Sequence, residues 1–423
     1  MENIYLTMCV EGQTCYMMAS KKNEDGKIVP VGVESETLAE DVMKCGVVLK
    51  EDALKMAFSK LKIKMANKLP DCEVVGLYMG MECRSMRSRE ITTIHELDVR
   101  RYVRKGDLDI LEDMATEKAG RNLIAMYEAG YECDEIATSN VTENVAKKIV
   151  KHSIAVNVAD KFHKDYTTFM PVGIEMYDVF PTPVARAMVV ATEQQRIDGC
   201  LVVSINVDYC SFTVMKNDKL VGTAVVPFGV EDLAHDFNRG KLSIAAANAL
   251  MGKLNYQEKF QPRVFKVDGQ QVTIDEDMMD SLKCRLEEIL TFGKKWVEGV
   301  ITWKEVRENV IITGKTVEFT GMKELIGELM DCVCLSANPC EELLPVKEYA
   351  DERYYGLIGM AALAKKNCVV EKNKEEQVIE ETQDDTDDNK GGEEKKKGRK
   401  KKSKSFMDFA NQLIMKFDND QES

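Results

Sequence analysis

The triplet Gly314 to Thr316 is the strongest candidate for phosphate chemistry in the sequence, because Gly-Lys-Thr ends the P-loop motif G-x-x-x-x-G-K-[ST]. The first glycine of that motif would fall at Asn309. A P-loop lysine also lies at a helix start, where backbone N–H groups and the helix dipole hold phosphate. Here the next helical pattern begins only at Met322. The stretch ITGKTVEFTGMKEL is therefore a different strand–turn–helix unit.

The cysteines and histidines give no metal-ligand spacing. The thirteen cysteines are scattered and odd in number, which favours free thiols in a reducing cytoplasm. Cys332, Cys334 and Cys340 are candidate metal ligands, but no histidine or fourth cysteine lies nearby, and buried thiols are the favoured interpretation. We expect no metal site and no catalytic residues.

Composition indicates a globular body without a membrane span. The 423 residues suffice for two or more domains, and 44% hydrophobic with 31% charged residues is ordinary for a soluble protein. The start MENIYLTMCV lacks the pattern of a signal peptide, and no apolar run is long enough to span a bilayer.

Charge is distributed unevenly around a net value of −14. Residues 371–394 sum to −8 and residues 395–404 to +8, which leaves −11 on residues 1–370 and −3 on the rest. The acidic body argues against nucleic-acid binding. Residues 371–404 are nearly free of hydrophobic side chains and predict a disordered linker.

The C-terminal residues 405–423 carry one apolar helical stripe. The preceding basic block could be a nucleic-acid tail, a solvated linker or a membrane-surface patch, and its position next to the stripe favours anionic lipid. The alternative for the stripe is a helix docked on the body or on a partner. The predicted membrane-binding residues are Lys395, Lys396, Lys397, Arg399, Lys400, Lys401, Lys402, Lys404, Phe406, Phe409, Leu413, Ile414 and Phe417.

Patterns within the body predict an α/β fold. CLVVSI, CSFTVM and LVGTAVVPF read as strands separated by the turns NVDY and KNDK, and VEDLAHDFN begins a helix. Further on, ENVIIT reads as a strand and MKELIGELM as a helix with Met322, Leu325, Ile326 and Leu329 on one face. Such units suggest a sheet with helices packed against it.

The order of these features resembles the FtsA family of bacterial cell-division proteins, within the actin/Hsp70 superfamily. ITGKTVEFTGMKELIGEL is similar to the adenosine motif of the superfamily, with Lys315 in place of its second glycine. VGIEMYDVFPTPVARAMVVATEQQR, VVPFGVEDLAHDF and YYGLIGMAALA resemble further segments of the family, and the tail resembles its membrane-targeting end.

The resemblance implies an actin-like two-lobed α/β fold, in which an FtsA-type small domain replaces actin subdomain 1B. LYMGMECRSMRSREI would form the first strands of the small domain and HELDVRRYVRK its helix, and strands at 200–205 and 309–313 would meet at a cleft. The implied ranges are lobe 1 at 1–77, 160–197 and 335–370, the small domain at 78–159, lobe 2 at 198–234 and 309–334, a 2B-like subdomain at 235–308, the linker at 371–404 and the amphipathic helix at 405–423.

By the same resemblance, the nucleotide motifs are degenerate. The segment from Val10 to Gln13 keeps one glycine, and the segment from Ser204 to Ser211 has lost the glycines and carboxylates of its counterpart. Lys315 could bind phosphate or be solvated, and Asp208 could hold Mg²⁺ through water or serve the turn. ATP and Mg²⁺, expected of the family, would be bound weakly or not at all. The cleft equivalents are Gly12, Gln13, Ser204, Asn206, Asp208, Gly229, Gly314 and Lys315.

The function that the resemblance implies is an adaptor without ATP hydrolysis. It would tether polymers of the tubulin-like protein FtsZ to the cytoplasmic face of the membrane at the division site, and could self-associate into filaments. The alternatives are a working actin-like ATPase and a PilM-like scaffold of pilus or secretion assembly.

Overall fold

A computed structural model describes residues 3–159, 169–171, 173–240, 242–267, 270–337 and 349–372. The chain divides into two units, residues 1–372 and 373–423. The second unit, with the basic block and the apolar stripe, lies outside the described residues. The last strand of the first unit, β20 (Val369–Glu371), pairs with β6 (Cys72–Val74), so regular structure extends one residue into the range predicted as linker.

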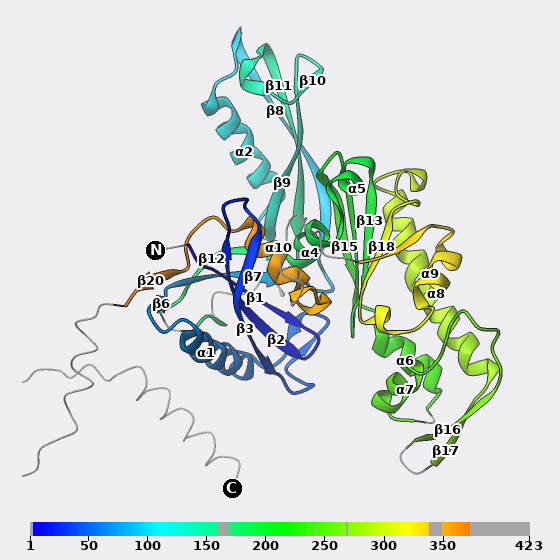
Figure 1. The fold of residues 1–423 in the computed structure, drawn as a ribbon. Coiled ribbons are helices and arrows are strands. Elements are labelled where there is room, and N and C mark those ends of the chain that lie inside the picture. Colours follow the sequence, from blue (N-terminus) through cyan, green and yellow to red (C-terminus); the bar gives the residue numbers. More distant parts are fainter. Residues whose placement is uncertain are drawn as a thin grey trace, which may run out of the picture. The chain divides into compact units, whose positions relative to one another are not determined.

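Two sheets of matching topology build the first unit (Figure 1). In the first sheet, three parallel strands are followed by two antiparallel ones, in the order β12-β7-β1-β2-β3. The second sheet repeats this pattern as β19-β18-β13-β14-β15. The strands of the first sheet are β12 (Glu175–Pro181), β7 (Gly76–Met81), β1 (Tyr5–Glu11), β2 (Thr14–Lys22) and β3 (Ile28–Thr37). Those of the second are β19 (Cys334–Ser336), β18 (Val310–Gly314), β13 (Cys200–Ile205), β14 (Cys210–Lys216) and β15 (Lys219–Val226).

The strand and helix predictions for residues 200–238 and 309–330 are confirmed. The tight turn at Asn217 and Asp218, both with positive φ, joins β14 to β15, as Asn and Asp tolerate left-handed backbone. β13 and β18 pair in parallel, with Ser204 opposite Thr313, so the two strands expected to meet do so. The helix at 322–330 buries Met322, Leu325 and Ile326, while Leu329 is only partly buried.

The second sheet continues into the strands of residues 87–157. β15 pairs with β8 (Arg87–Tyr102) at Ala224 and Arg87, and β8 leads on to β11 (Val145–Asn157), β9 (Leu123–Cys133) and β10 (Ile136–Thr138). The helix α2 (Lys105–Ala119) packs on these strands.

Two sequence predictions about this region were wrong. HELDVRRY is the second half of strand β8, not a helix: buried Ile91, Thr93 and Leu97 alternate with more exposed neighbours at the spacing of a strand. The helix begins after it, at Lys105. In addition, the range assigned to the small domain begins inside β7, which lies in the first sheet between β12 and β1.

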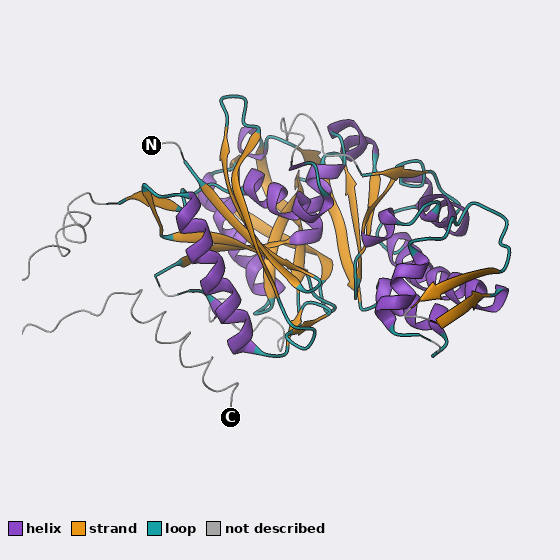
Figure 2. Cartoon of the chain, turned by 60° about the horizontal axis from the view of Figure 1, so that its bottom comes forward, coloured by secondary structure: helices purple, strands orange, loops and turns teal. Residues whose placement is uncertain are grey.

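Helices cover both sheets (Figure 2). One core surrounds the first sheet, includes Phe58 and Leu357, and also takes in one face of the second sheet through Val202 and Ile311. The other core lies on the opposite face of β13, β14 and β18 and includes Leu282, Leu286 and Phe212. A Cβ on Gly359 would lie 1.9 Å from the carbonyl oxygen of Ala185, so helices α10 and α4 touch backbone to backbone. The helices are α1 (Glu51–Lys68), α4 (Thr182–Val190), α5 (Glu193–Asp198), α6 (Val230–Asn238), α7 (Ile244–Met251), α8 (Glu276–Glu298), α9 (Met322–Met330) and α10 (Tyr355–Leu363).

Two small hairpins complete the first unit, β4 (Met43–Lys44) with β5 (Val47–Val48) and β16 (Arg263–Val267) with β17 (Gln270–Ile274). In the described ranges, no helix has both the length and the apolar character that crossing a bilayer requires.

Candidate nucleotide cleft

The equivalent hairpin turns of the two sheets face each other. Gly12 lies in the β1–β2 turn with φ +56°, and Val207 lies in the β13–β14 turn. A Cβ on Gly12 would be only 3.2 Å from Cγ2 of Val207. The structure thus brings together the two segments that resemble degenerate phosphate motifs, and a valine side chain lies between them.

The backbone donors beside this turn are already used. The N–H of Val230, at the start of α6, donates to the carbonyl of Asn206 (2.9 Å), and the N–H of Glu231 donates to the carbonyl of Val207 (2.8 Å). A helix N-terminus attracts an anion when its N–H groups are unpaired. Here the turn itself takes the place that an anion would occupy.

Glycines 229 and 314 allow the turns to pack closely. A Cβ on Gly229 would lie 2.6 Å from the backbone nitrogen of Asp208, and one on Gly314 would lie 2.6 Å from the carbonyl oxygen of Ile205. The Ser204 hydroxyl donates to Oδ1 of the buried Asn206 over 3.1 Å. Both glycines and this hydroxyl therefore serve contacts within the protein.

Asp208 is buried and is hydrogen-bonded to the β4–β5 hairpin, which lies earlier in the chain. Its carboxylate accepts the backbone N–H of Cys45 in the β4–β5 turn, and the Cys45 thiol donates to the Asp208 carbonyl over 3.1 Å. Burial raises the pKa of the Asp208 carboxyl, and the Cys45 N–H partly offsets this. Asp208 does not adopt the left-handed backbone expected of a turn residue, and its carboxylate instead joins this turn to the β4–β5 hairpin. Within the described ranges, no group of three metal-ligating side chains is present.

A buried arginine neutralises two carboxylates beside the turns. Arg186 of α4, only 2% exposed, donates to Glu82 (2.9 and 3.3 Å) and to Glu11 (2.9 Å). Burial opposes the charge of Arg186, but Glu82 and Glu11 outweigh it and hold the guanidinium pKa well above its usual value. Burial raises the pKa of Glu11, and Arg186 counteracts this.

Sequence reasoning missed Arg186 and Glu82. The available signal was an arginine inside the otherwise apolar helix PVARAMVV, because such a charge needs a buried partner. The partner itself could not be read from the sequence, since Glu82 and Glu11 lie 104 and 175 residues away.

The remaining candidates lie at the edge of the cleft. The Lys315 ammonium pairs with Glu318 at 2.5 Å, and the side-chain nitrogen of Gln13 donates to the Glu40 carbonyl over 3.4 Å. The N–H of Gly314 donates to a Glu352 carboxylate oxygen over 2.8 Å. A carboxylate of the protein thus binds the backbone donor of the glycine turn.

A cavity of about 380 Å³ remains beside Lys315, between Val207 and helix α7. Its walls are mostly apolar and include Val230, Gly252 and Phe319. The Asn248 carboxamide oxygen is buried there without a hydrogen-bond partner among the described residues. The volume lies within the range of small-molecule sites, and Val207 forms one of its walls.

Glu352 should make stability depend on pH. Burial raises its pKa from 4.5 to about 7, which the Gly314 N–H and Arg186 only partly offset. Between these pH values the folded protein holds a proton that the unfolded chain releases, so the free energy of unfolding falls as pH rises. Glu352→Gln should therefore stabilise the protein by about 2–3 kcal/mol at pH 8 and change little at pH 4.

Urea unfolding of wild type and variant across this pH range measures the difference. Glu318→Gln, at an exposed ion pair, is the matched control and should change the free energy of unfolding by less than about 1 kcal/mol. Parallel profiles for wild type and Glu352→Gln would contradict the assignment.

No protein-family model matches the chain. It is 22% identical to the cell division protein FtsA of Bacillus subtilis over 212 residues, which are 48% of this chain and 47% of that protein. It is 21% identical to FtsA of Porphyromonas gingivalis over 276 residues, 60% of this chain and 54% of that protein. The chain thus spans about half the length of the curated relatives it matches.

Among solved structures, the fold is similar to a chain of the PilM-PilN type IV pilus biogenesis complex. The TM-score is 0.59 at 12% identity, over 85% of this chain and 99% of that one. The repeated sheet topology and this similarity define a protein with the actin-like fold. With the two curated matches, the chain is a divergent FtsA-like member of that fold class.

Proposed function

We propose that the protein is a cell-division adaptor that links FtsZ polymers to the membrane and does not hydrolyse ATP. The single observation that carries the non-catalytic part is the contact of Val207 with Gly12, which fills the phosphate end of the cleft. The names of the curated relatives support the role in cell division. The same proposal places the protein at the cytoplasmic face of the membrane, with the domain ranges given above except that the small domain starts at β8.

ATP should bind weakly or not at all, and no phosphate should be released. Phosphoryl transfer relies on positioned charge and metal, whereas the carboxylates near the turns are paired with Arg186 and Cys45. Calorimetry with Mg-ATP and a phosphate-release assay measure both quantities. Micromolar binding would contradict the first expectation, and steady turnover would favour the alternative of a working ATPase.

The 2B-like range 235–308 is the proposed FtsZ-binding region, by resemblance to the FtsA family. One surface there suits a peptide: Phe292 of α8 is 53% exposed beside a groove of about 420 Å³ that Cys284, Thr291 and Lys295 also line. Glu287 and Glu288 line the groove as well, so its charge is mixed and Phe292 is its main apolar contact. Substitutions in this groove can test the proposal without deleting helix α8, which contributes to the core.

Phe292→Asp should weaken retention of FtsZ at least tenfold in a pull-down with the purified full-length protein, because an exposed aromatic side chain in a groove is a typical binding hot spot. Val99→Asp, at a similarly exposed position (63%) on β8, is the matched control and should retain FtsZ. Equal retention by both variants would exclude this groove as the FtsZ site.

A PilM-like scaffold is the second candidate, favoured by the similarity that covers nearly all of the PilM-PilN chain. Self-association into filaments is compatible with either function. A scaffold of this kind needs no FtsZ and no membrane-binding tail. If FtsZ fails to bind while the tail-deleted protein still localises at the cell envelope, the scaffold is the better proposal.

A further inference from the structure

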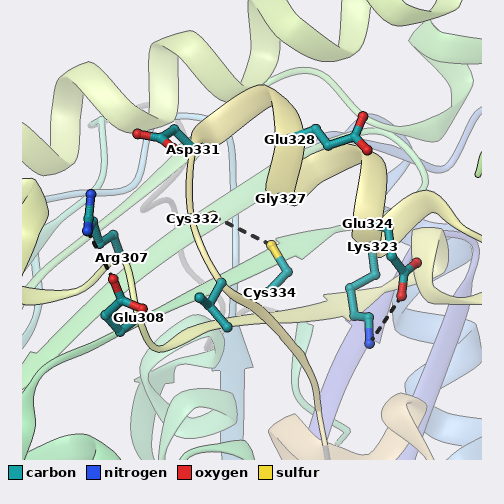
Figure 3. Close-up of a pocket in the computed structure, with 10 residues that line it drawn as sticks. Arg307, Glu308, Lys323, Glu324, Gly327, Glu328, Asp331, Cys332 and Cys334 are labelled. Carbon is teal, nitrogen blue, oxygen red and sulfur yellow. Dashed lines mark hydrogen bonds and ion pairs between the residues drawn. The ribbon is translucent and has the colours of Figure 1, made fainter.

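A cavity of about 560 Å³ lies where the end of α9 leads into β19, away from the cleft residues described above (Figure 3). Cys332 and Cys334 line it together with charged side chains of both signs. The basic ones are Arg307 and Lys323, and the acidic ones are Glu308, Glu324, Glu328 and Asp331. This combination of two thiols and mixed charge has no role in the proposed adaptor function.

The backbone brings the two thiols together. Asp331 ends α9 in the left-handed conformation (φ +54°), and the Cys332 N–H donates to the carbonyl of Gly327 (3.1 Å). Cys334 then begins strand β19. The bend places the two sulfur atoms 3.6 Å apart, the contact drawn as a dashed line in Figure 3.

These thiols are reachable, unlike most others of the chain. In the described ranges, nine cysteines are buried, Cys284 is exposed, and Cys332 and Cys334 are partly exposed beside the cavity. The two thiols share a hydrogen bond in which either sulfur can donate, and this contact lowers the pKa of Cys332 and raises that of Cys334. Lys294 also lowers the pKa of Cys332, against burial and the nearby Asp331 and Glu308. Cys332 is thus the better nucleophile and Cys334 the resolving thiol.

We propose that Cys332 and Cys334 form a redox-active dithiol site that reacts with low-molecular-weight disulfides bearing both carboxylate and ammonium groups. The Cys332 thiolate attacks one sulfur of the small disulfide, a mixed disulfide forms, and the first small thiolate leaves and takes up a proton. Cys334 then loses its proton and attacks the Cys332 sulfur, and the second small thiolate leaves and is protonated. The protein loses two electrons and two protons, and the disulfide is reduced to two thiols.

The charged side chains that line the cavity determine which disulfides it binds. Arg307 pairs with its neighbour Glu308 (3.0 Å) and Lys323 with its neighbour Glu324 (3.4 Å). Such exposed pairs are weak, so both cations can bind substrate carboxylates, while Glu328 and Asp331 face the same cavity for ammonium groups. A wholly neutral disulfide would gain nothing from these side chains.

The test treats reduced full-length protein with glutathione disulfide, blocks the remaining thiols by alkylation and maps the cysteines by mass spectrometry. We expect an internal Cys332–Cys334 disulfide, and in Cys334→Ser a mixed disulfide held on Cys332. In Cys332→Ser, reaction at Cys334 should be at least tenfold slower. Cys284→Ser is the matched control and should react at positions 332 and 334 like wild type.

Substrate choice is tested by Arg307→Gln with Lys323→Gln. The double variant should react several-fold more slowly with glutathione disulfide and unchanged with bis(2-hydroxyethyl) disulfide. Circular dichroism checks that each variant is folded. Formation of the Cys332–Cys334 disulfide is judged on the wild-type protein, so a variant that fails to fold does not affect this result. Two alkylated thiols at 332 and 334 after excess glutathione disulfide, or faster reaction at Cys284, would overturn the site. Equal slowing with both disulfides would overturn the recognition by charge.

Discussion

Arg186→Met should lower the free energy of unfolding by about 3–5 kcal/mol, because it leaves the Glu82 and Glu11 carboxylates buried without their counter-ion. Arg186 is among the largest fully buried side chains, and its guanidinium joins the end of β1, the residue after β7 and helix α4. Urea unfolding at pH 7.5 measures the loss. The effect should shrink at lower pH, because burial raises the pKa of Glu11 and this carboxyl takes up a proton once Arg186 is gone.

A rescue variant separates lost charge pairing from lost packing. Arg186→Met combined with Glu82→Gln and Glu11→Gln removes all three charges and should recover most of the lost stability, since buried ion networks can be replaced by neutral groups at little cost. Arg196→Met, at a partly exposed ion pair with Asp218, is the control and should cost about 1 kcal/mol or less. If the triple variant is as unstable as Arg186→Met, packing and not charge explains the effect.

Leu413→Asp should release the protein from anionic vesicles, with at least tenfold weaker binding. If the stripe residues insert into the acyl boundary, as proposed, a charge there opposes burial. The basic block can add about 1 kcal/mol per Lys or Arg near an anionic surface, an attraction that salt screens. Phe406→Asp should act like Leu413→Asp. Raising salt should also weaken binding, and neutral vesicles should bind poorly.

Met415→Asp is the matched control for the tail. It makes the same change from an apolar residue to aspartate, but on the opposite face of an ideal helix, so vesicle binding should be largely retained. Vesicle flotation measures all three variants, and circular dichroism checks that the body stays folded. Undiminished flotation of a protein that lacks residues 395–423 would show that the tail is not the anchor.

The sequence by itself determined the elements whose signals are local. Strands and turns between Cys200 and Val226, and the glycine turn after β18, were predicted because apolar runs and Asn/Asp turn residues carry their own information. The absence of the glycines that the family's nucleotide motifs contain was also visible in the sequence, because residue identity does not depend on the fold. HELDVRRY failed because charged side chains on the exposed face of β8 obscured its period of two.

Only the tertiary structure decided what fills the cleft. That Val207 lies against Gly12 follows from the repeated sheet topology, which sets two distant hairpin turns opposite each other. The Arg186 ion cluster and the pairing of Asp208 with Cys45 join residues more than a hundred positions apart. No local pattern encodes such partners, because each is selected by the packing of a whole sheet, and burial then makes the pairing obligatory.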